Sequence, residues 1–167
     1  MERCGTIKIP SGDTRDGIQF FGTYAQSIDA KGRVILPTPY RDALGKDFMI
    51  GLNSTANAIA FYPREKWNSI LEDLRRLPST DEVAMDYVRF IAGNSFSNYE
   101  LDSQGRTILP AALRQMLQLG KNISFVGVID YFEIWDTEVF EARSAQVRDN
   151  MSERLKYISS LRQQATP

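Results

Sequence analysis

The sequence predicts an α+β fold, mainly β, in which two tandem copies of one small unit are flanked by helices. The first support is an internal repeat, because the motif Asp29-x-x-Gly-Arg33 recurs as Asp102-x-x-Gly-Arg106 at an offset of 73 residues. In each copy, short runs of β-branched and aromatic residues predict strands. Apolar residues at helical spacing lie between the copies and after the second one. Neighbouring units of this kind bury their apolar faces against each other.

The repeat continues beyond the motif, with compensating insertions in its loops. An Ile-Leu-Pro sequence follows both copies, as Ile35-Leu36-Pro37 and as Ile108-Leu109-Pro110. Further matches join Arg41 to Arg114, Leu44 to Leu117, Gly45-Lys46 to Gly120-Lys121, and Trp67 to Phe140. So many matches in one order indicate a tandem repeat rather than a chance similarity.

In the first copy, we expect residues 24–28 and 34–36 to form a hairpin whose turn contains Gly32, a residue free to adopt positive φ. A helix should follow, with Thr38 as its N-cap, Pro39 at its first position and Gly45 at its left-handed end. Two further strands are expected at residues 48–50 and 58–62. The second copy should have strands at 99–101, 107–109, 123–128 and 131–135, with a helix at 111–118.

Three more helices are expected outside the strands. The first covers residues 63–77 and ends at Pro78, and a capping box of Ser79 with Glu82 predicts the start of the second. The third begins near Thr137 and carries Phe140, Val147, Met151, Leu155 and Ile158 on one side. Apolar stripes usually meet another surface, so Trp67, Leu71, Met151 and Leu155 predict a homo-oligomer larger than a dimer.

These elements predict the organisation of the chain along its length. Residues 1–17 show no period and are expected to be a mobile N-terminal extension. The two repeated units should cover residues 20–67 and 97–140, with a helical connector at 68–95 between them. Residues 141–167 should form a C-terminal helix and tail.

Composition argues against an enzyme. The sequence has no histidine, which excludes Ser-His-Asp triads and the usual zinc sites. The common phosphate-binding glycine motifs are absent, and the single Cys4 has no base nearby. We therefore expect no catalytic residues, no cofactor and no metal.

Several features favour a cytoplasmic protein. No apolar stretch follows Met1, so we expect no signal peptide, and no segment is apolar enough to predict a membrane span. One cysteine cannot form an internal disulfide, which agrees with a reducing compartment. The net charge of −1 lacks the basic excess common in nucleic-acid-binding domains, so binding would depend on local charge.

The Asp-x-x-Gly-Arg motif has two interpretations. The carboxylate can accept hydrogen bonds from turn amides and can pair with the arginine four residues later. Such a pair braces a hairpin, where an exposed ion pair contributes only about 0–1 kcal/mol. Alternatively, aspartate orients the arginine outward, toward phosphate or a guanine edge. The residues alone leave both interpretations open.

Local charge differs between the two copies. Between residues 29 and 46, the first copy contains four cations and two anions: Lys31, Arg33, Arg41 and Lys46 against Asp29 and Asp42. In the second copy Gln104 replaces the lysine and Glu100 adds an acid. We therefore expect the first tip to attract DNA more strongly than the second.

The motifs resemble those of the MraZ family. The opening Phe21-Gly22-Thr23-Tyr24, the first Asp29-Ala-Lys-Gly-Arg33 and the following Pro37 are similar to the start of MraZ proteins. The second motif, Leu113-Arg114 and Phe132-Glu133-Ile134-Trp135 match as well, so the resemblance covers about residues 20 to 143. The family belongs to the SpoVT/AbrB superfamily of bacterial regulators.

The resemblance implies a double swapped-hairpin, AbrB-like barrel formed by the two repeats. It also implies a ring-like homo-oligomer, an octamer, that represses the bacterial division and cell-wall gene cluster by binding short direct repeats in double-stranded promoter DNA. The implied DNA-binding residues are Asp29, Lys31, Arg33, Arg41, Asp102, Arg106 and Arg114. Arg41 and Arg114 are equally typical of a solvated helix face. We expect a cytoplasmic, nucleoid-associated protein.

A different class of function also fits the sequence. An antitoxin-like module would bind a partner protein, with the C-terminal helix from Thr137 to Arg162 as the binding segment and the hairpins only braced. A DNA mobility shift distinguishes this alternative from the regulator.

Overall fold

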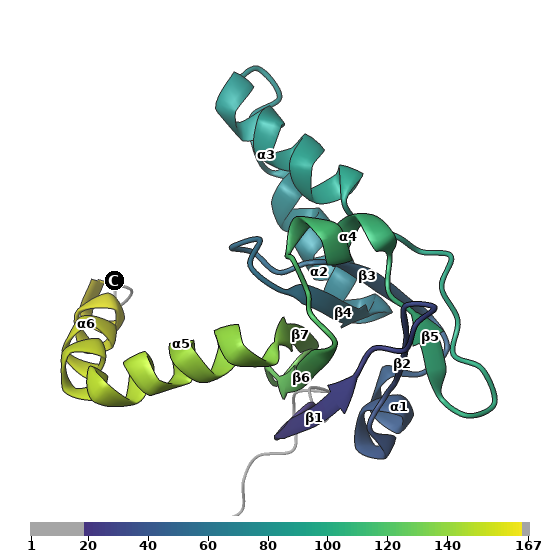
Figure 1. Cartoon of the computed structure of the whole chain (residues 1–167). Helices are drawn as coiled ribbons and strands as arrows, with labels where there is room; N and C mark the ends of the chain where they lie inside the picture. Colours follow the sequence, from purple (N-terminus) through teal and green to yellow (C-terminus); the bar gives the residue numbers. More distant parts are fainter. Residues whose placement is uncertain (1–18, 165–167) are drawn as a thin grey trace, which may run out of the picture.

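The computed structural model describes residues 19–164, so the predicted extension at 1–17 lies outside the described residues (Figure 1). The first repeat contains β1 (Thr23–Ser27), β2 (Arg33–Ile35), α1 (Thr38–Leu44), β3 (Phe48–Leu52) and β4 (Ile59–Pro63). The helices α2 (Arg64–Arg75) and α3 (Glu82–Gly93) follow. The second repeat contains β5 (Arg106–Ile108), α4 (Ala111–Met116), β6 (Asn122–Gly127) and β7 (Phe132–Asp136), followed by α5 (Thr137–Asp149) and α6 (Met151–Gln164). The fold is therefore mixed α/β, with two tandem units.

Strands of the two repeats interleave in two antiparallel sheets. The larger sheet has the order β1-β6-β7-β4-β3, and β2 pairs with β5 in a separate two-stranded sheet. The expected hairpin of β1 with β2 is therefore wrong, since each strand pairs with a strand of the other repeat. An isolated hairpin is at best marginally stable, whereas this exchange buries the apolar faces of both repeats together.

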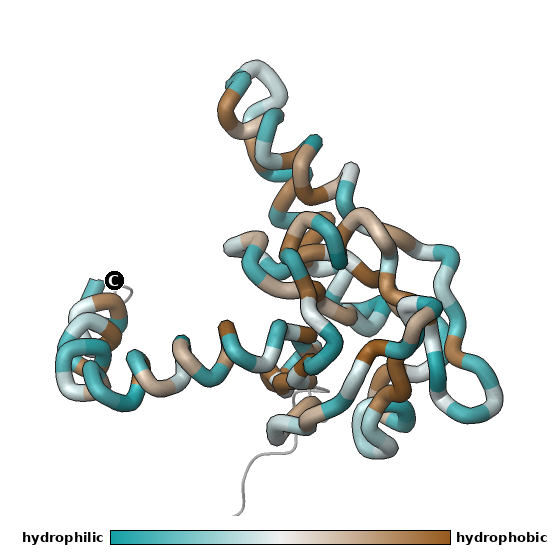
Figure 2. Tube along the Cα trace, in the orientation of Figure 1, coloured by the Kyte–Doolittle hydropathy of each residue, from teal (hydrophilic) through white to brown (hydrophobic). Residues whose placement is uncertain are grey.

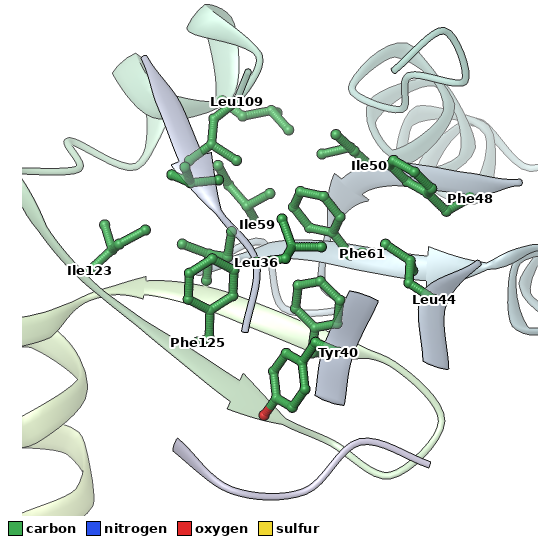
Figure 3. Packing of buried hydrophobic residues seen from close by; sticks show 14 of the residues in the cluster. Leu36, Tyr40, Leu44, Phe48, Ile50, Ile59, Phe61, Leu109, Ile123 and Phe125 are labelled. Carbon is green, nitrogen blue, oxygen red and sulfur yellow. The ribbon is translucent and has the colours of Figure 1, made fainter. Parts of the chain in front are cut away.

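Both repeats contribute to one main core. Figure 3 shows Leu36 of the first repeat and Leu109 of the second in the same cluster, and both are fully buried. Tyr40 of α1 packs at its edge and donates a 2.7 Å hydrogen bond from its hydroxyl to the carbonyl of Gly22. Burial raises the pKa of Tyr40 to about 12.

A smaller cluster packs on the opposite face of the large sheet. Met49 and Tyr62 alternate along their strands with residues of the main core, so they point to the other face. Trp67 of α2 and Ile91 of α3 cover them. Trp67 is buried and Leu71 packs against the same cluster, so these two residues do not form the exposed stripe expected from sequence.

The expected strand at residues 99–101 is absent from the described structure. In its place, Phe96 makes a single bridge to Ile50 of β3. Ser97 and Asn98 follow, and asparagine is depleted in strands, which accounts for the missing strand pairing. The second repeat therefore lacks the counterpart of β1.

Two predicted helix caps are wrong. The carbonyl of Pro37 accepts the first hydrogen bonds of α1, from the amides of Tyr40 and Arg41, so Pro37 is the N-cap and Thr38 lies inside the helix. For α3, the Asp81 carboxylate accepts the Ala84 amide at 2.8 Å, while Ser79 lies inside a turn. By contrast, Gly45 ends α1 with φ 71°, as expected.

The C-terminal helix is divided in two. Asn150 ends α5, where its side-chain amide donates to the carbonyl of Gln146, and α6 then begins in a new direction (Figure 1). Neither helix contains a buried residue, and Figure 2 shows apolar and polar residues mixed along both. The single continuous apolar side predicted for this segment is therefore wrong. No helix in the described part of the chain is both long and apolar enough to cross a membrane.

Candidate nucleic-acid interface

The first tip, residues 29–33, is a turn closed by its aspartate. Asp29 accepts hydrogen bonds from the amides of Lys31 at 2.9 Å and Arg33 at 2.8 Å through one carboxylate oxygen. The other oxygen accepts the Nε–H of Arg33 at 2.6 Å. These contacts confirm the predicted turn and the predicted pairing of aspartate with arginine.

The second tip, residues 102–106, reproduces this geometry. Asp102 accepts from the amides of Gln104 and Arg106, each at 2.9 Å, and from Arg106 Nε at 2.7 Å. In both tips aspartate engages Nε, while the terminal Nη groups donate to nothing within residues 19–164. The arginine is therefore oriented by its own tip and keeps its outer donors available.

The amides and the guanidinium also determine how the aspartates titrate. The pKa of Asp29 lies below its usual 3.8, chiefly because the Arg33 amide donates to the carboxylate, and also because the Arg33 guanidinium does. The pKa of Asp102 is lowered in the same way by Arg106. The carboxylates of Asp29 and Asp102 are therefore fully ionised at neutral pH.

An arginine from the opposite repeat lies over the glycine of each tip. Gly32 has φ 80°, and a Cβ atom there would lie 2.7 Å from Cζ of Arg114. Gly105 has φ 73°, and a Cβ atom there would clash with the side chain of Arg41. A side chain at either glycine is disfavoured both by the backbone and by the arginine across it.

These crossing arginines are anchored rather than free. Arg41 Nε donates to the carbonyl of Leu36 at 2.8 Å, and Arg114 Nε donates to that of Leu109 at 3.2 Å. Both side chains are half-buried. A freely solvated helix face, one of the two interpretations of Arg41 and Arg114, does not describe them.

The small sheet is a ribbon, formed by β2 and β5, with a tip at each end. Arg33 lies opposite Ile108, and Ile35 lies opposite Arg106. Val34 and Thr107 point inward and are buried. The outer face of the ribbon thus carries two arginine–isoleucine pairs related by the symmetry of the repeat.

Two lysines beside the tips were not among the predicted site residues, although Lys46 was counted in the local charge of the first copy. Lys46 lines a hollow of about 580 Å³ beside the second tip, together with Arg41. Lys121 lines a hollow of about 560 Å³ beside the first tip, together with Arg114. The match of Gly45-Lys46 to Gly120-Lys121 in the repeat could have identified both.

All seven predicted site residues therefore gather around the ribbon and its tips. They come from both repeats, and the exchange of strands brings them together. Among residues 19–164, no group of His, Cys, Asp or Glu side chains is placed to hold a metal ion.

Two mirrored tips that each present an arginine, with Arg41, Arg114, Lys46 and Lys121 beside them, are typical of a protein that binds a polyanion such as nucleic acid. The chain also matches a known protein family. A family described as "MraZ protein, putative antitoxin-like" matches residues 19–90 and 95–157. The chain belongs to the MraZ family, as the resemblance predicted.

Curated relatives span most of the chain. A protein from Lachnoclostridium phytofermentans named "Transcriptional regulator MraZ" is 39% identical, with 84% of this chain and 95% of the relative covered. Proteins of the same name from Lactiplantibacillus plantarum and Acetivibrio thermocellus are 40% and 38% identical, covering 81% and 80% of this chain and 97% and 90% of the relatives. The names of these relatives describe regulators of transcription, the class of function that the resemblance implied.

Proposed function

We propose that the chain is a sequence-specific transcriptional regulator that binds double-stranded DNA through its two tips. The observation that carries the proposal is that Asp29 and Asp102 hold Arg33 and Arg106 by Nε alone, which leaves both Nη groups without a partner among residues 19–164. Arginine's planar fork of donors suits guanine O6 and N7 in the major groove. The names of the relatives support regulation of transcription.

The other cations serve the DNA backbone in this proposal. Lys31, Lys46 and Lys121 flank the tips, and Arg41 and Arg114 present their Nη groups beside them. Contacts to phosphate position a protein on DNA, whereas contacts to base edges supply sequence specificity. Arg33 and Arg106 accordingly read bases, and the remaining cations set the register.

The target follows from the family resemblance. The protein acts as a repressor of the bacterial division and cell-wall gene cluster, in the cytoplasm and at the nucleoid. The footprint of the purified protein on DNA upstream of its own gene tests this directly. Protection of repeated short sites near the promoter is expected, and a footprint without discrete sites would contradict sequence-specific regulation.

Assembly into a ring-like homo-oligomer, an octamer, completes the proposal. In this proposal the two sheets of each chain form a swapped-hairpin barrel. Because the two repeats already pair with each other inside one chain, neighbouring subunits meet through head-to-tail contacts. Exposed apolar residues on the projecting helices support such contacts, including Tyr87, Phe90, Met151 and Leu155. Engaging several tips on one duplex raises avidity by roughly 10²–10⁴.

Head-to-tail subunits present their tips in one orientation, so the operator consists of short direct repeats about one helical turn apart. Inserting about 5 bp between repeats places neighbouring sites on opposite faces and should abolish the avidity. Inserting a full helical turn between the repeats should reduce DNA affinity less, because neighbouring sites stay on the same face. Gel shifts at fixed salt measure this, and affinity that ignores spacing, or favours inverted repeats, would contradict the ring mechanism.

A second candidate function is binding of a partner protein in the manner of an antitoxin. The family's description and the exposed apolar residues of α5 and α6 favour it. In that case the tips are only braced, and truncation after residue 149 should remove partner binding. A mobility shift that survives this truncation but disappears in Arg33→Ala would assign DNA binding to the tips instead.

A further inference from the structure

The outer face of the ribbon carries two exposed isoleucines whose role is not explained by the core. Ile35 and Ile108 are 45% and 48% exposed, whereas the alternate residues Val34 and Thr107 are buried. A single exposed isoleucine is ordinary in a folded protein. Here, however, both copies of the repeat place one at the same position, next to a candidate DNA-reading arginine.

The ribbon's register brings each isoleucine beside one arginine. The Leu36 amide donates a hydrogen bond to the Gly105 carbonyl, and the Leu109 amide donates one to the Gly32 carbonyl, both at 2.9 Å. Hydrogen-bonded and non-hydrogen-bonded pairs alternate along an antiparallel ladder, so the two arginine–isoleucine pairs occupy non-hydrogen-bonded positions. There the Cα atoms are about 4.5 Å apart and the side chains are closest.

We propose that Ile35 and Ile108 read the C5-methyl groups of thymines, beside the guanines bound by Arg106 and Arg33. This inference rests on the proposed DNA-binding function. A two-stranded ribbon fits the major groove, about 12 Å wide, where the thymine methyl is the apolar group on a base edge. Since base pairs are spaced by about 3.4 Å, the thymine lies within one or two steps of the guanine.

Charge favours DNA over a second copy of this chain as the occupant of this face. Arg33, Arg106 and Lys121 line the hollow that also contains Ile35. A second hollow contains Ile108 with Arg33 and Arg106, and there Glu100 and Asp102 balance the two arginines. The hollow of Ile35 thus carries three cations against Asp29 alone, and this cationic excess matches a surface that is itself polyanionic and carries small apolar groups.

Replacing thymine by deoxyuridine tests the proposal, because it removes the methyl and preserves base pairing. The probes are a duplex selected by the wild-type protein from a random library and the same duplex with dU at every dT. The wild-type protein should bind the dU duplex about fourfold more weakly for each thymine methyl that an isoleucine covers. The double variant Ile35→Ala/Ile108→Ala should bind both duplexes equally. Val83→Ala, at an 81% exposed position on α3, is the matched control and should keep the wild-type difference.

Each alternative gives a different result. Equal binding of both duplexes by the wild-type protein, or an undiminished dU effect in the double variant, would overturn thymine reading and leave DNA binding intact. A changed mass of the double variant in light scattering would assign the face to a subunit contact and also overturn it. If the library yields no bound duplex, the proposed function itself fails.

Discussion

The two tips have the same internal geometry but different surroundings. Asp29 and Asp102 accept the same three hydrogen bonds, with distances that agree within 0.1 Å. The first tip carries Lys31 where the second carries Gln104, and only the second has Glu100 beside it. The geometry of the aspartate–arginine pair is therefore duplicated, while the local charge around it is not.

The segments that lead into the tips differ as well. All five residues of β1 pair with β6 before the first tip. Before the second tip, only Phe96 makes a bridge to the sheet. The first tip is thus both more cationic and more firmly supported, so we expect it to be the stronger reader in the proposed function.

The largest expected effect comes from removing the first arginine. Arg33→Ala should weaken specific DNA binding by about 1–3 kcal/mol, because alanine cannot make the bidentate hydrogen bonds to guanine. Arg106→Ala should cost less. Isothermal titration or gel shifts measure both, and the melting temperatures should remain near wild type because an exposed pair contributes little.

Arg33→Lys is the matched control, since it keeps the charge but not the planar fork. It should restore non-specific binding but not sequence discrimination. Wild-type affinity in a folded Arg33→Ala protein would assign the motif to bracing alone, and a larger effect in Arg106→Ala would reverse the order of the tips.

The glycines provide the next largest effect, on stability. Gly32→Ala and Gly105→Ala should each reduce the free energy of unfolding by about 1–2 kcal/mol because of their positive φ. Gly105→Ala should cost more, since Arg41 crosses Gly105 more closely than Arg114 crosses Gly32. Urea denaturation measures the difference, with Gly93→Ala, where an added Cβ meets nothing within 4 Å, as the control. Equal costs of Gly32→Ala and Gly105→Ala would show that the crossing arginines do not constrain the tips, and no cost at either position would contradict the backbone argument.

Exchanging the distinguishing residues should have a smaller effect. Lys31→Gln makes the first tip like the second and should reduce the slope of log affinity against log salt by about 0.9, the value of one phosphate contact. Gln104→Lys should increase the slope by a similar amount. Slopes unchanged in both variants would show that the electrostatic difference between the tips does not act on DNA.

The smallest effect is expected from pH. The pKa values of Asp29 and Asp102 lie below 3.8 in the folded chain, so their contribution to stability is complete above that value and disappears only as pH falls through the folded pKa. With no histidine in the sequence, DNA affinity should be flat between about pH 5.5 and 8. A clear transition in that range would point to a titrating group outside the tips.

Local features were predictable from sequence, and strand partners were not. The turn amides and the Arg33 guanidinium lie within four residues of Asp29, so the spacing alone determines that geometry. Strand pairing depends on distant segments, and the sequence does not show that β2 prefers β5 to β1. The resemblance to a swapped-hairpin family indicated this exchange of strands. The hairpin predicted from the residues alone, between 24–28 and 34–36, did not.

The missed features have similar causes. Lys46 and Lys121 lie in loops whose positions depend on the exchange of strands, although the repeat relates them. Asp81 and Ser79 both suit a helix cap, and only the turn closed by Pro78 decides between them. The sequence therefore predicted the aspartates, the arginines and Lys31 of the site, but not Lys46 and Lys121 beside them.

Guanine methylation interference tests the central claim most directly, because N7-methylation blocks the major-groove contact of an arginine. On a selected duplex, the wild-type protein should show interference at two guanines for each site. Arg33→Ala should remove interference at one of them, and Arg106→Ala should remove it at the other. Interference patterns that are identical in the wild type and both variants would contradict reading of DNA by the two tips.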